Sequence, residues 1–327
     1  MTREAPTAGA DALASDGADT SGMDTNRMDT NGMDTNGADT EVRPPSLSPS
    51  RASDFMTCPL LYRFRVLDRL PQKPSAAATR GTVVHSVLER LFDLPAAERL
   101  PEQAHALLAP EWARLLAEEP ELATLFVDGE GEQEWLTSAQ GLLDAYFALE
   151  DPRRLEPAER ELYVECDLES GLRLRGYVDR LDEAPDGSLR VVDYKTGRAP
   201  HDSYEGKALF QMKFYALVLW RLRGEVPRML QLLYLGSGEV LRYQPDEADL
   251  RATERKIQAL AAAIATATER GDWRPNPSKL CGWCDHQALC PAFGGTPPEL
   301  PLIPVPRVPQ ASAEDERPSP HTPGDEV

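Results

Sequence analysis

The chain has 327 residues, of which 41% are hydrophobic, so it can bury one large core or two small ones. Its formal net charge of −19 argues against strong nonspecific binding to nucleic acid. No segment reaches the roughly 20 consecutive apolar residues that span a bilayer. We therefore expect a cytoplasmic protein, in a compartment that keeps its thiols reduced.

The two ends of the chain differ from the middle in composition. Residues 1–42 are rich in Ala, Gly, Asp and Thr and contain a polar five-residue repeat, whereas residues 295–327 are rich in Pro and acidic residues. Neither end holds enough apolar side chains to bury a core, so we expect two disordered tails. The tails carry net charges of −7 and −4, which leaves −8 for the rest of the chain. The remaining residues, 43–294, are expected to form one folded domain.

The start of this domain combines bases with aromatic residues. Six bases fall between residues 51 and 80 against two acids, and Tyr62 and Phe64 lie among them. This combination suits the backbone and the stacked bases of a single-stranded nucleic acid. The same stretch predicts a helix over residues 59–67 whose apolar face packs on the core, and both interpretations can hold.

The next predicted helix carries His85 and Glu89, which are four residues apart and therefore share one face. Val84 and Val87 form an adjacent apolar stripe that faces the core. An isolated histidine in such a helix is more often a half-buried structural residue, so His85 is a candidate ligand only if other ligands lie near it. A helical insert is predicted over residues 97–150.

The second half of the domain alternates between strands and helices. The predicted elements are strands at 159–168, 172–182 and 188–195, a helix at 204–223, strands at 228–235 and 239–243, and a long helix at 246–270. This order predicts an α/β fold with a mixed central sheet flanked by helices.

Two of these strands bring acidic residues together. A hairpin that is symmetric about Asp186 places Asp179 opposite Asp193, and Lys195 shares a face with Asp193 because side chains alternate along a strand. Cross-strand carboxylates stand only about 5 Å apart and repel each other, so this pair calls for a cation between its members. Two acids around a divalent metal, with a lysine beside them, predict a site of phosphodiester hydrolysis. The alternative is an ordinary solvated strand face.

The five cysteines form a second chemical signal. Cys281, Cys284 and Cys290 are closely spaced, which indicates metal ligands rather than disulfides, and Cys58 is the natural fourth ligand. Cys166 lies in an alternating strand and is expected to be a small strand residue. One remote cysteine with a compact Cys-x2-Cys-x5-Cys run favours a 4Fe–4S cluster, and Zn²⁺ is the alternative. Such a site would tie the two ends of the domain together and stabilise the fold.

Four segments, taken in order, are similar to the motifs of RecB-type PD-(D/E)XK nucleases. They are residues 81–85 (GTVVH), 176–179 (GYVD), 192–196 (VDYKT) and 211–215 (QMKFY). The flanking cysteines resemble the iron–sulfur motif of two branches of that family, the AddB nuclease subunit and the CRISPR-associated single-strand exonucleases. The resemblance covers about residues 48–293. It implies a restriction-endonuclease-like core with a helical insert and an iron–sulfur staple.

The resemblance also implies roles for the polar residues of these segments. His85, Asp179 and Asp193 would hold a divalent metal, and a set of carboxylates with an imidazole suits Mg²⁺ or Mn²⁺. Lys195 would orient the attacking water and steady the charge on the phosphate. The metal would neutralise the phosphate and lower the pKa of a bound water.

Gln211 and Tyr215 lie four residues apart on a helix and would line the cleft, although ordinary helix packing explains them as well. Glu89 and Glu165 are further acidic candidates. The predicted function is that of a metal-dependent DNA exonuclease that prefers single strands and serves repair or recombination. One alternative is a noncatalytic DNA-binding subunit that supports a separate helicase, since the sequence holds no Gly-x-x-x-x-Gly-Lys-Ser/Thr phosphate loop of its own. The other alternative is a CRISPR spacer-processing nuclease.

Overall fold

The structure is a computed structural model, and it describes residues 2–4, 45–126, 131–200 and 205–301. The two predicted tails lie almost entirely outside these residues. At the start of the first tail, Thr2–Glu4 forms a short strand, β1, which the sequence did not predict. None of the described helices is both long and apolar enough to cross a membrane.

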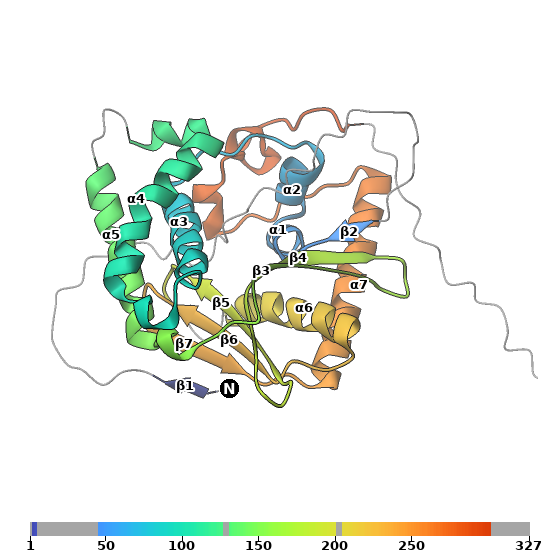
Figure 1. The fold of residues 1–327 in the computed structure, drawn as a ribbon. Coiled ribbons are helices and arrows are strands. Elements are labelled where there is room, and N and C mark those ends of the chain that lie inside the picture. Colours follow the sequence, from blue (N-terminus) through green and yellow to red (C-terminus); the bar gives the residue numbers. More distant parts are fainter. Residues whose placement is uncertain (1, 5–44, 127–130, 201–204, 302–327) are drawn as a thin grey trace, which may run out of the picture.

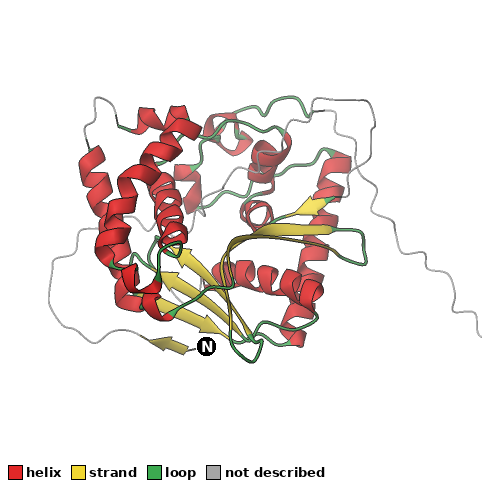
Figure 2. Ribbon diagram, in the orientation of Figure 1, coloured by secondary structure: helices red, strands yellow, loops and turns green. Residues whose placement is uncertain are grey.

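A mixed sheet forms the centre of the described domain (Figures 1 and 2). Its further strands are β2 (Ser46–Leu47), β3 (Glu159–Asp167), β4 (Arg173–Glu183), β5 (Leu189–Lys195), β6 (Met229–Tyr234) and β7 (Glu239–Tyr243). The strand order is β1-β7-β6-β5-β4-β2, and β3 pairs with β4 off this path. The β5–β6 and β2–β4 pairs are parallel, whereas the other pairs are antiparallel.

One edge of β4 is divided between two partners. β5 pairs with residues 180–183 of this strand, and β2 pairs with Arg173 and Leu174. Both partners lie on the same edge, because β3 occupies the other edge along nearly the whole of β4. The segment 175–179 therefore lies between the two partners, where side chains from neighbouring elements can approach the strand.

Helices cover both faces of the sheet (Figure 2). The α-helices of the described residues are α1 (Pro49–Thr57), α2 (Pro59–Tyr62), α3 (Ala76–Leu91), α4 (Pro101–Glu118), α5 (Glu132–Leu149), α6 (Glu205–Arg223) and α7 (Glu247–Arg270). Apolar residues of α3, α4 and α5 pack on one face, together with Val192 and Tyr194 of β5. Apolar residues of α6 and α7 pack on the other face with Val191. Because side chains alternate along β5, Asp193 and Lys195 point to the α6 side, like Val191.

The secondary structure that the sequence predicts is confirmed in type and order. Strands β3 to β7 and helices α6 and α7 begin and end within one residue of their predicted bounds, and α4 and α5 form the predicted insert. Residue 204, where the predicted helix began, lies outside the described residues. The predicted helix at 59–67 is instead the short helix α2 followed by a π-helix, Arg63–Leu67. The observed mixed sheet with helices on both faces is the predicted α/β architecture.

The prediction that Tyr62 and Phe64 stack on nucleic-acid bases is wrong, because both rings are buried. Tyr62 stacks on Trp273, with their ring centroids 5.9 Å apart. Phe64 packs against the ring of His286. These aromatic residues belong to a small third core that joins the start of the domain to its end.

Two of the bases in the same stretch form ion pairs within the protein. Arg63 donates to Asp68 at 3.0 Å, and Arg65 donates to Asp54 at 2.7 Å. The backbone carbonyl of Pro298 also accepts from Arg63. Part of the basic character seen in the sequence is therefore neutralised inside the fold.

Candidate active site

The hairpin between β4 and β5 has the predicted register. Its turn is centred on Asp186. Arg180 stands opposite Val192 in the last backbone pair of the ladder. Asp179 and Asp193 lie one residue beyond that pair, at the point where β4 loses β5 as its partner.

The backbone of Tyr194 connects two candidate ligands. Its N–H donates to Oδ2 of Asp179 at 2.8 Å, and its carbonyl oxygen lies 2.9 Å from Nε2 of His85. A carbonyl only accepts hydrogen bonds, so Nε2 carries a hydrogen. In the neutral imidazole the lone pair then lies on Nδ1, which is 3.4 Å from Oδ2 of Asp179. Nδ1 is therefore the nitrogen that could bind a metal.

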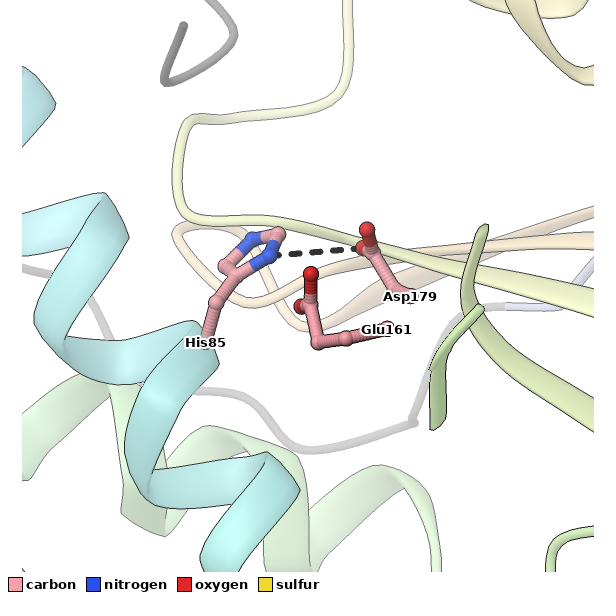
Figure 3. A group of neighbouring side chains, drawn as sticks. All are labelled: His85, Glu161 and Asp179. Atoms are coloured by element: carbon pink, nitrogen blue, oxygen red, sulfur yellow. Dashed lines mark ion pairs between the residues drawn. The ribbon is translucent and has the colours of Figure 1, made fainter. Parts of the chain in front are cut away.

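A third side chain, that of Glu161, completes a group with these two. Figure 3 shows His85 of α3, Glu161 of β3 and Asp179 of β4 pointing toward one another. One ligand atom from each residue lies within 4.8 Å of the other two, and all three side chains are partly buried. One nitrogen and two carboxylate oxygens at this spacing could hold a divalent cation such as Mg²⁺ or Mn²⁺.

The sequence analysis missed Glu161. In the β3–β4 ladder, Leu162 stands opposite Val178 and Arg160 stands opposite Arg180, so Glu161 and Asp179 occupy facing positions. A β3–β4 hairpin that is symmetric about residue 170 places Glu161 opposite Asp179, just as the hairpin about Asp186 gives the β4–β5 register.

The backbone of Glu161 is unusual as well. Its φ angle is +45°, in the left-handed region that residues with a side chain rarely adopt. Such a conformation costs about 1–2 kcal/mol and persists only where the surroundings fix it. Strain of this kind is concentrated at functional sites, which supports a role for Glu161 beyond the sheet.

Four other predicted site residues form a chain of contacts on the α6 side of the sheet. Nζ of Lys195 lies 3.0 Å from Oδ2 of Asp193, and it donates to Oε1 of Gln211 at 2.8 Å. Nε2 of Gln211 in turn donates to the hydroxyl of Tyr215 at 3.4 Å. Asp193 is only 2% exposed, so its carboxylate and the Lys195 ammonium form a pair that is held out of bulk water.

The structure thus brings the six predicted site residues into two adjacent groups rather than one. His85 and Asp179 lie with Glu161, whereas Asp193 does not belong to that group within the described residues. The two groups meet at Tyr194. Its backbone hydrogen-bonds His85 and Asp179 of the first group, and its chain neighbours Asp193 and Lys195 belong to the second. The other acidic candidates also lie outside the metal-sized group: the backbone carbonyl of Glu89 accepts from Arg160, and the carboxylate of Glu165 accepts from Tyr163.

The glycine of the GYVD segment has a steric explanation. A Cβ atom on Gly176 would lie 2.7 Å from Cε1 of Tyr215 and 3.4 Å from Cδ of Pro49. Real Cβ contacts are longer than the first of these distances, so a side chain here would displace the Tyr215 ring. Because Tyr215 contacts Gln211, Gly176 helps to set the position of the chain of contacts that ends at Lys195.

A buried arginine anchors the strand end that carries these residues. Arg180 donates to the Tyr194 hydroxyl at 2.7 Å and to the carboxylate of Glu150 at 2.9 Å. Burial raises the pKa of the Tyr194 hydroxyl, so this group stays neutral. The contact fixes the Tyr194 side chain on the α5 side, which leaves its backbone groups directed at His85 and Asp179.

The cysteines of the predicted metal site lie at one cavity. Cys58, Cys281, Cys284 and Cys290 all line it, mostly among apolar neighbours. Among the described residues, no three of these thiols come within 4.8 Å of one another. The set is therefore too widely spaced to hold one ion as it stands.

Cys166 lies elsewhere, on β3. It packs against the core under α6, as the sequence predicted for a small strand residue. Burial raises the pKa of its thiol to about 11, so it stays protonated. Cys166 therefore differs from the other four in place and in surroundings.

The chain is similar to several known proteins. The chain is 26% identical over 290 residues to the Gene 69 protein of Mycobacterium phage L5, covering 76% of this chain and 97% of that protein. It is 26% identical over 278 residues to the Gene 69 protein of Mycobacterium phage D29, covering 77% and 99%. A crystal structure from Eubacterium rectale, provisionally described as an exonuclease, aligns with a TM-score of 0.47 at 12% identity, covering 74% of this chain and 87% of the other.

A family model described as the PD-(D/E)XK nuclease superfamily matches residues 46–291. This range contains both groups of candidate catalytic residues and the four cysteines at the cavity. It also contains every strand of the sheet except β1. The chain belongs to the PD-(D/E)XK nuclease superfamily.

Proposed function

We propose that this protein is a metal-dependent nuclease of the RecB type that hydrolyses phosphodiester bonds in DNA, acting as an exonuclease that prefers single strands. The observation that supports it most is the convergence of His85, Glu161 and Asp179, whose ligand atoms lie within 4.8 Å of one another. Members of this superfamily usually use divalent metal ions, and this donor set suits Mg²⁺ or Mn²⁺. When bound, such an ion would neutralise the phosphate and lower the pKa of a coordinated water.

The residues of the protein would share the remaining tasks. The Tyr194 carbonyl keeps the hydrogen of His85 on Nε2, so Nδ1 stays available as a ligand. Asp193 and Gln211 hold the Lys195 ammonium in one position beside the metal group. Held by these two partners, the ammonium would orient a water and stabilise negative charge on the phosphate. The family resemblance implies that Asp193, which follows Val192 and precedes Tyr194 in β5, would serve as a further ligand.

The test is digestion of end-labelled single-stranded and duplex DNA with Mg²⁺ or Mn²⁺. The wild-type protein should shorten the single strand from an end, and EDTA should stop the reaction. The Asp193→Ala variant should lose cleavage while it keeps its fold. Cleavage that persists in EDTA or in this variant would contradict the proposal, and DNA binding without any cleavage would favour the noncatalytic subunit of a helicase complex.

We further propose that Cys58, Cys281, Cys284 and Cys290 hold a 4Fe–4S cluster. All four line one cavity, but no three of the described thiols are close enough for a single ion. Tetrahedral Zn²⁺, with Zn–S bonds of about 2.3 Å, would draw its ligands closer together than this. A cluster of four irons separates its thiolates further, so the wide spacing favours it over zinc.

Backbone amides around the cavity support the same proposal. The N–H of Asn276 donates to Sγ of Cys58 at 3.3 Å, and the N–H of Ser278 donates to Sγ of Cys281 at 3.3 Å. Amide hydrogen bonds stabilise charged sulfur and tune the potential of iron–sulfur clusters. They would hold the thiolates in place around the metal.

The proposed cluster can be tested on protein purified without oxygen. We expect visible absorbance, with about four irons and four sulfides per chain. Cys281→Ser should remove the colour and reduce the soluble yield, whereas Cys166→Ser, which changes the cysteine outside the cavity, should remain coloured. Zinc in place of iron, or unchanged absorbance in Cys281→Ser, would contradict the proposal.

A further inference from the structure

Two tyrosines form an exposed pair on the sheet beside the metal group. Tyr163 of β3 and Tyr177 of β4 stand directly opposite each other, with their ring centroids 5.2 Å apart and their planes tilted by 56°. Their residues are 45% and 38% exposed, although large aromatic side chains in this protein are mostly buried. The pair is therefore a surface feature that the core does not require.

The pair lies next to the group that could hold the metal. Tyr163 is two residues along β3 from Glu161, and Tyr177 is two residues along β4 from Asp179, which corresponds to about 7 Å along each strand. Val164 and Val178 pack into the core under α6, so the tyrosines stand on the opposite face of this hairpin. A chain bound at the metal group can reach the rings within one or two nucleotides.

The surroundings of the rings suit a nucleic-acid strand. The next side chain of β4 on the same face as Tyr177 is that of Arg175. It interacts electrostatically with the Tyr163 hydroxyl. Beyond it, Arg173 forms exposed ion pairs with Glu165 and Asp167. Exposed pairs of this kind contribute little to stability, so an arginine can exchange a carboxylate for a phosphate at small cost. Aromatic rings with neighbouring cations bind single strands by stacking on bases, whichever the base.

We propose that Tyr163 and Tyr177 form a stacking platform that binds the unpaired bases of single-stranded DNA beside the scissile phosphate. This inference rests on the proposed nuclease function and gives it a physical basis for strand preference. A base paired within a duplex keeps its faces covered by its neighbours, so the platform selects strands whose bases are free. The buried rings of Tyr62 and Phe64 cannot perform this task.

A cross-strand aromatic pair can also serve only to stabilise a sheet, so the test must separate stacking from folding. Binding of a labelled oligonucleotide is measured in the Asp193→Ala background, where the substrate is not consumed. Replacing both tyrosines with leucine should weaken binding of the single strand by about 5- to 100-fold. Binding of blunt duplex should change by less than about twofold. Replacing both tyrosines with phenylalanine keeps the rings and should preserve single-strand binding. Leu222→Ala removes an exposed apolar side chain elsewhere and should have no effect.

A spectroscopic readout reports stacking directly. The fluorescent base 2-aminopurine, placed one or two nucleotides from the end of the oligonucleotide, should be quenched on binding by the parent and by the phenylalanine variant, but not by the leucine variant. Equal single-strand affinity in the leucine variant would overturn the platform, as would an equal loss on both substrates. In either case cleavage by the wild-type protein would leave the nuclease proposal standing. Absence of cleavage in wild type would instead overturn the nuclease proposal, and the platform with it.

Discussion

The candidate active site and the cysteine cavity are built in different ways. The first lies on strands β3, β4 and β5 and on helices α3 and α6, and its polar side chains already contact one another. The second lies on short turns of 3-10 helix between Lys279 and Phe293, with Cys58 added from the junction of α1 and α2. Three apolar residues of those turns, Leu280, Trp283 and Phe293, remain about half exposed.

The difference suggests how each region depends on metal. In the candidate active site, the backbone of Tyr194 already holds His85 and Asp179, so loss of an ion should affect catalysis more than folding. The backbone hydrogen bonds within the cysteine loop are all local, joining residues at most five positions apart, and the loop packs on the rest of the domain mainly through its contact with α2 and Trp273. Binding of a metal by residues distant in sequence becomes folding free energy. We therefore expect loss of the cluster to unfold this region.

The largest effect should come from removing the proposed 4Fe–4S cluster. Oxidative release of the iron should expose residues 49–67 and 271–295 to proteolysis and to hydrogen exchange, because the tie between the two segments is lost. The amides of β4 to β6 should stay protected. Equal protection of the cysteine region from proteolysis and hydrogen exchange, with and without iron, would contradict the idea that this region needs metal to fold.

The next effect should come from the metal group. Glu161→Gln should reduce kcat/KM for DNA cleavage by about 100-fold or more, because it removes a charged ligand while it keeps the shape of the side chain. The melting temperature should change little. Glu165→Gln is the matched control, since this acid lies four residues along the same strand and outside the metal-sized group. An equal loss of kcat/KM in both variants would mean that cleavage depends on the negative charge of this strand and not on metal ligation by Glu161.

A smaller effect is expected at Gly176. Gly176→Ala places a methyl group 2.7 Å from Tyr215 and should displace Gln211 and Lys195, so activity should fall by about 10- to 100-fold with a stability loss of about 1–3 kcal/mol. Gly141→Ala is the control, because nothing lies within 4 Å of its Cβ. This change within α5 should raise the free energy of unfolding by about 0.5–1 kcal/mol. Denaturant unfolding measures the stability of the two variants, and cleavage rates measure their activity.

The smallest effect is a change in stability at Asp249 of α7, which contacts α6 and β7. Burial alone would raise the pKa of Asp249, but hydrogen bonds from Tyr243 and Lys213 outweigh it and hold that pKa below its usual value. This stabilisation is complete above the unfolded pKa of about 4 and is lost as pH falls through the lower folded value. Asp249→Asn should therefore cost about 1 kcal/mol at pH 7 and almost nothing near pH 2. A cost that does not change with pH would contradict this assignment.

The sequence could predict the elements because their apolar periods are long and regular, and it could predict the β4–β5 register because the Asp186 turn is short. Glu161 could have been found in the same way, because a β3–β4 hairpin centred at residue 170 places it opposite Asp179, but nothing in the sequence indicates its φ angle of +45°. The sequence also could not show that Tyr62 and Phe64 are buried, because aromatic residues beside arginines suit a core and a binding surface equally well. Burial depends on the later partner Trp273, more than 200 residues away in the chain.

The most direct test of the account is a calorimetric titration of Mn²⁺ into protein purified without oxygen. The account predicts one class of site on the wild-type protein whose Kd rises at least about tenfold in Glu161→Gln and in His85→Ala, and is unchanged in Glu165→Gln. Equal Mn²⁺ affinity in all four proteins would contradict the claim that His85, Glu161 and Asp179 hold the catalytic metal.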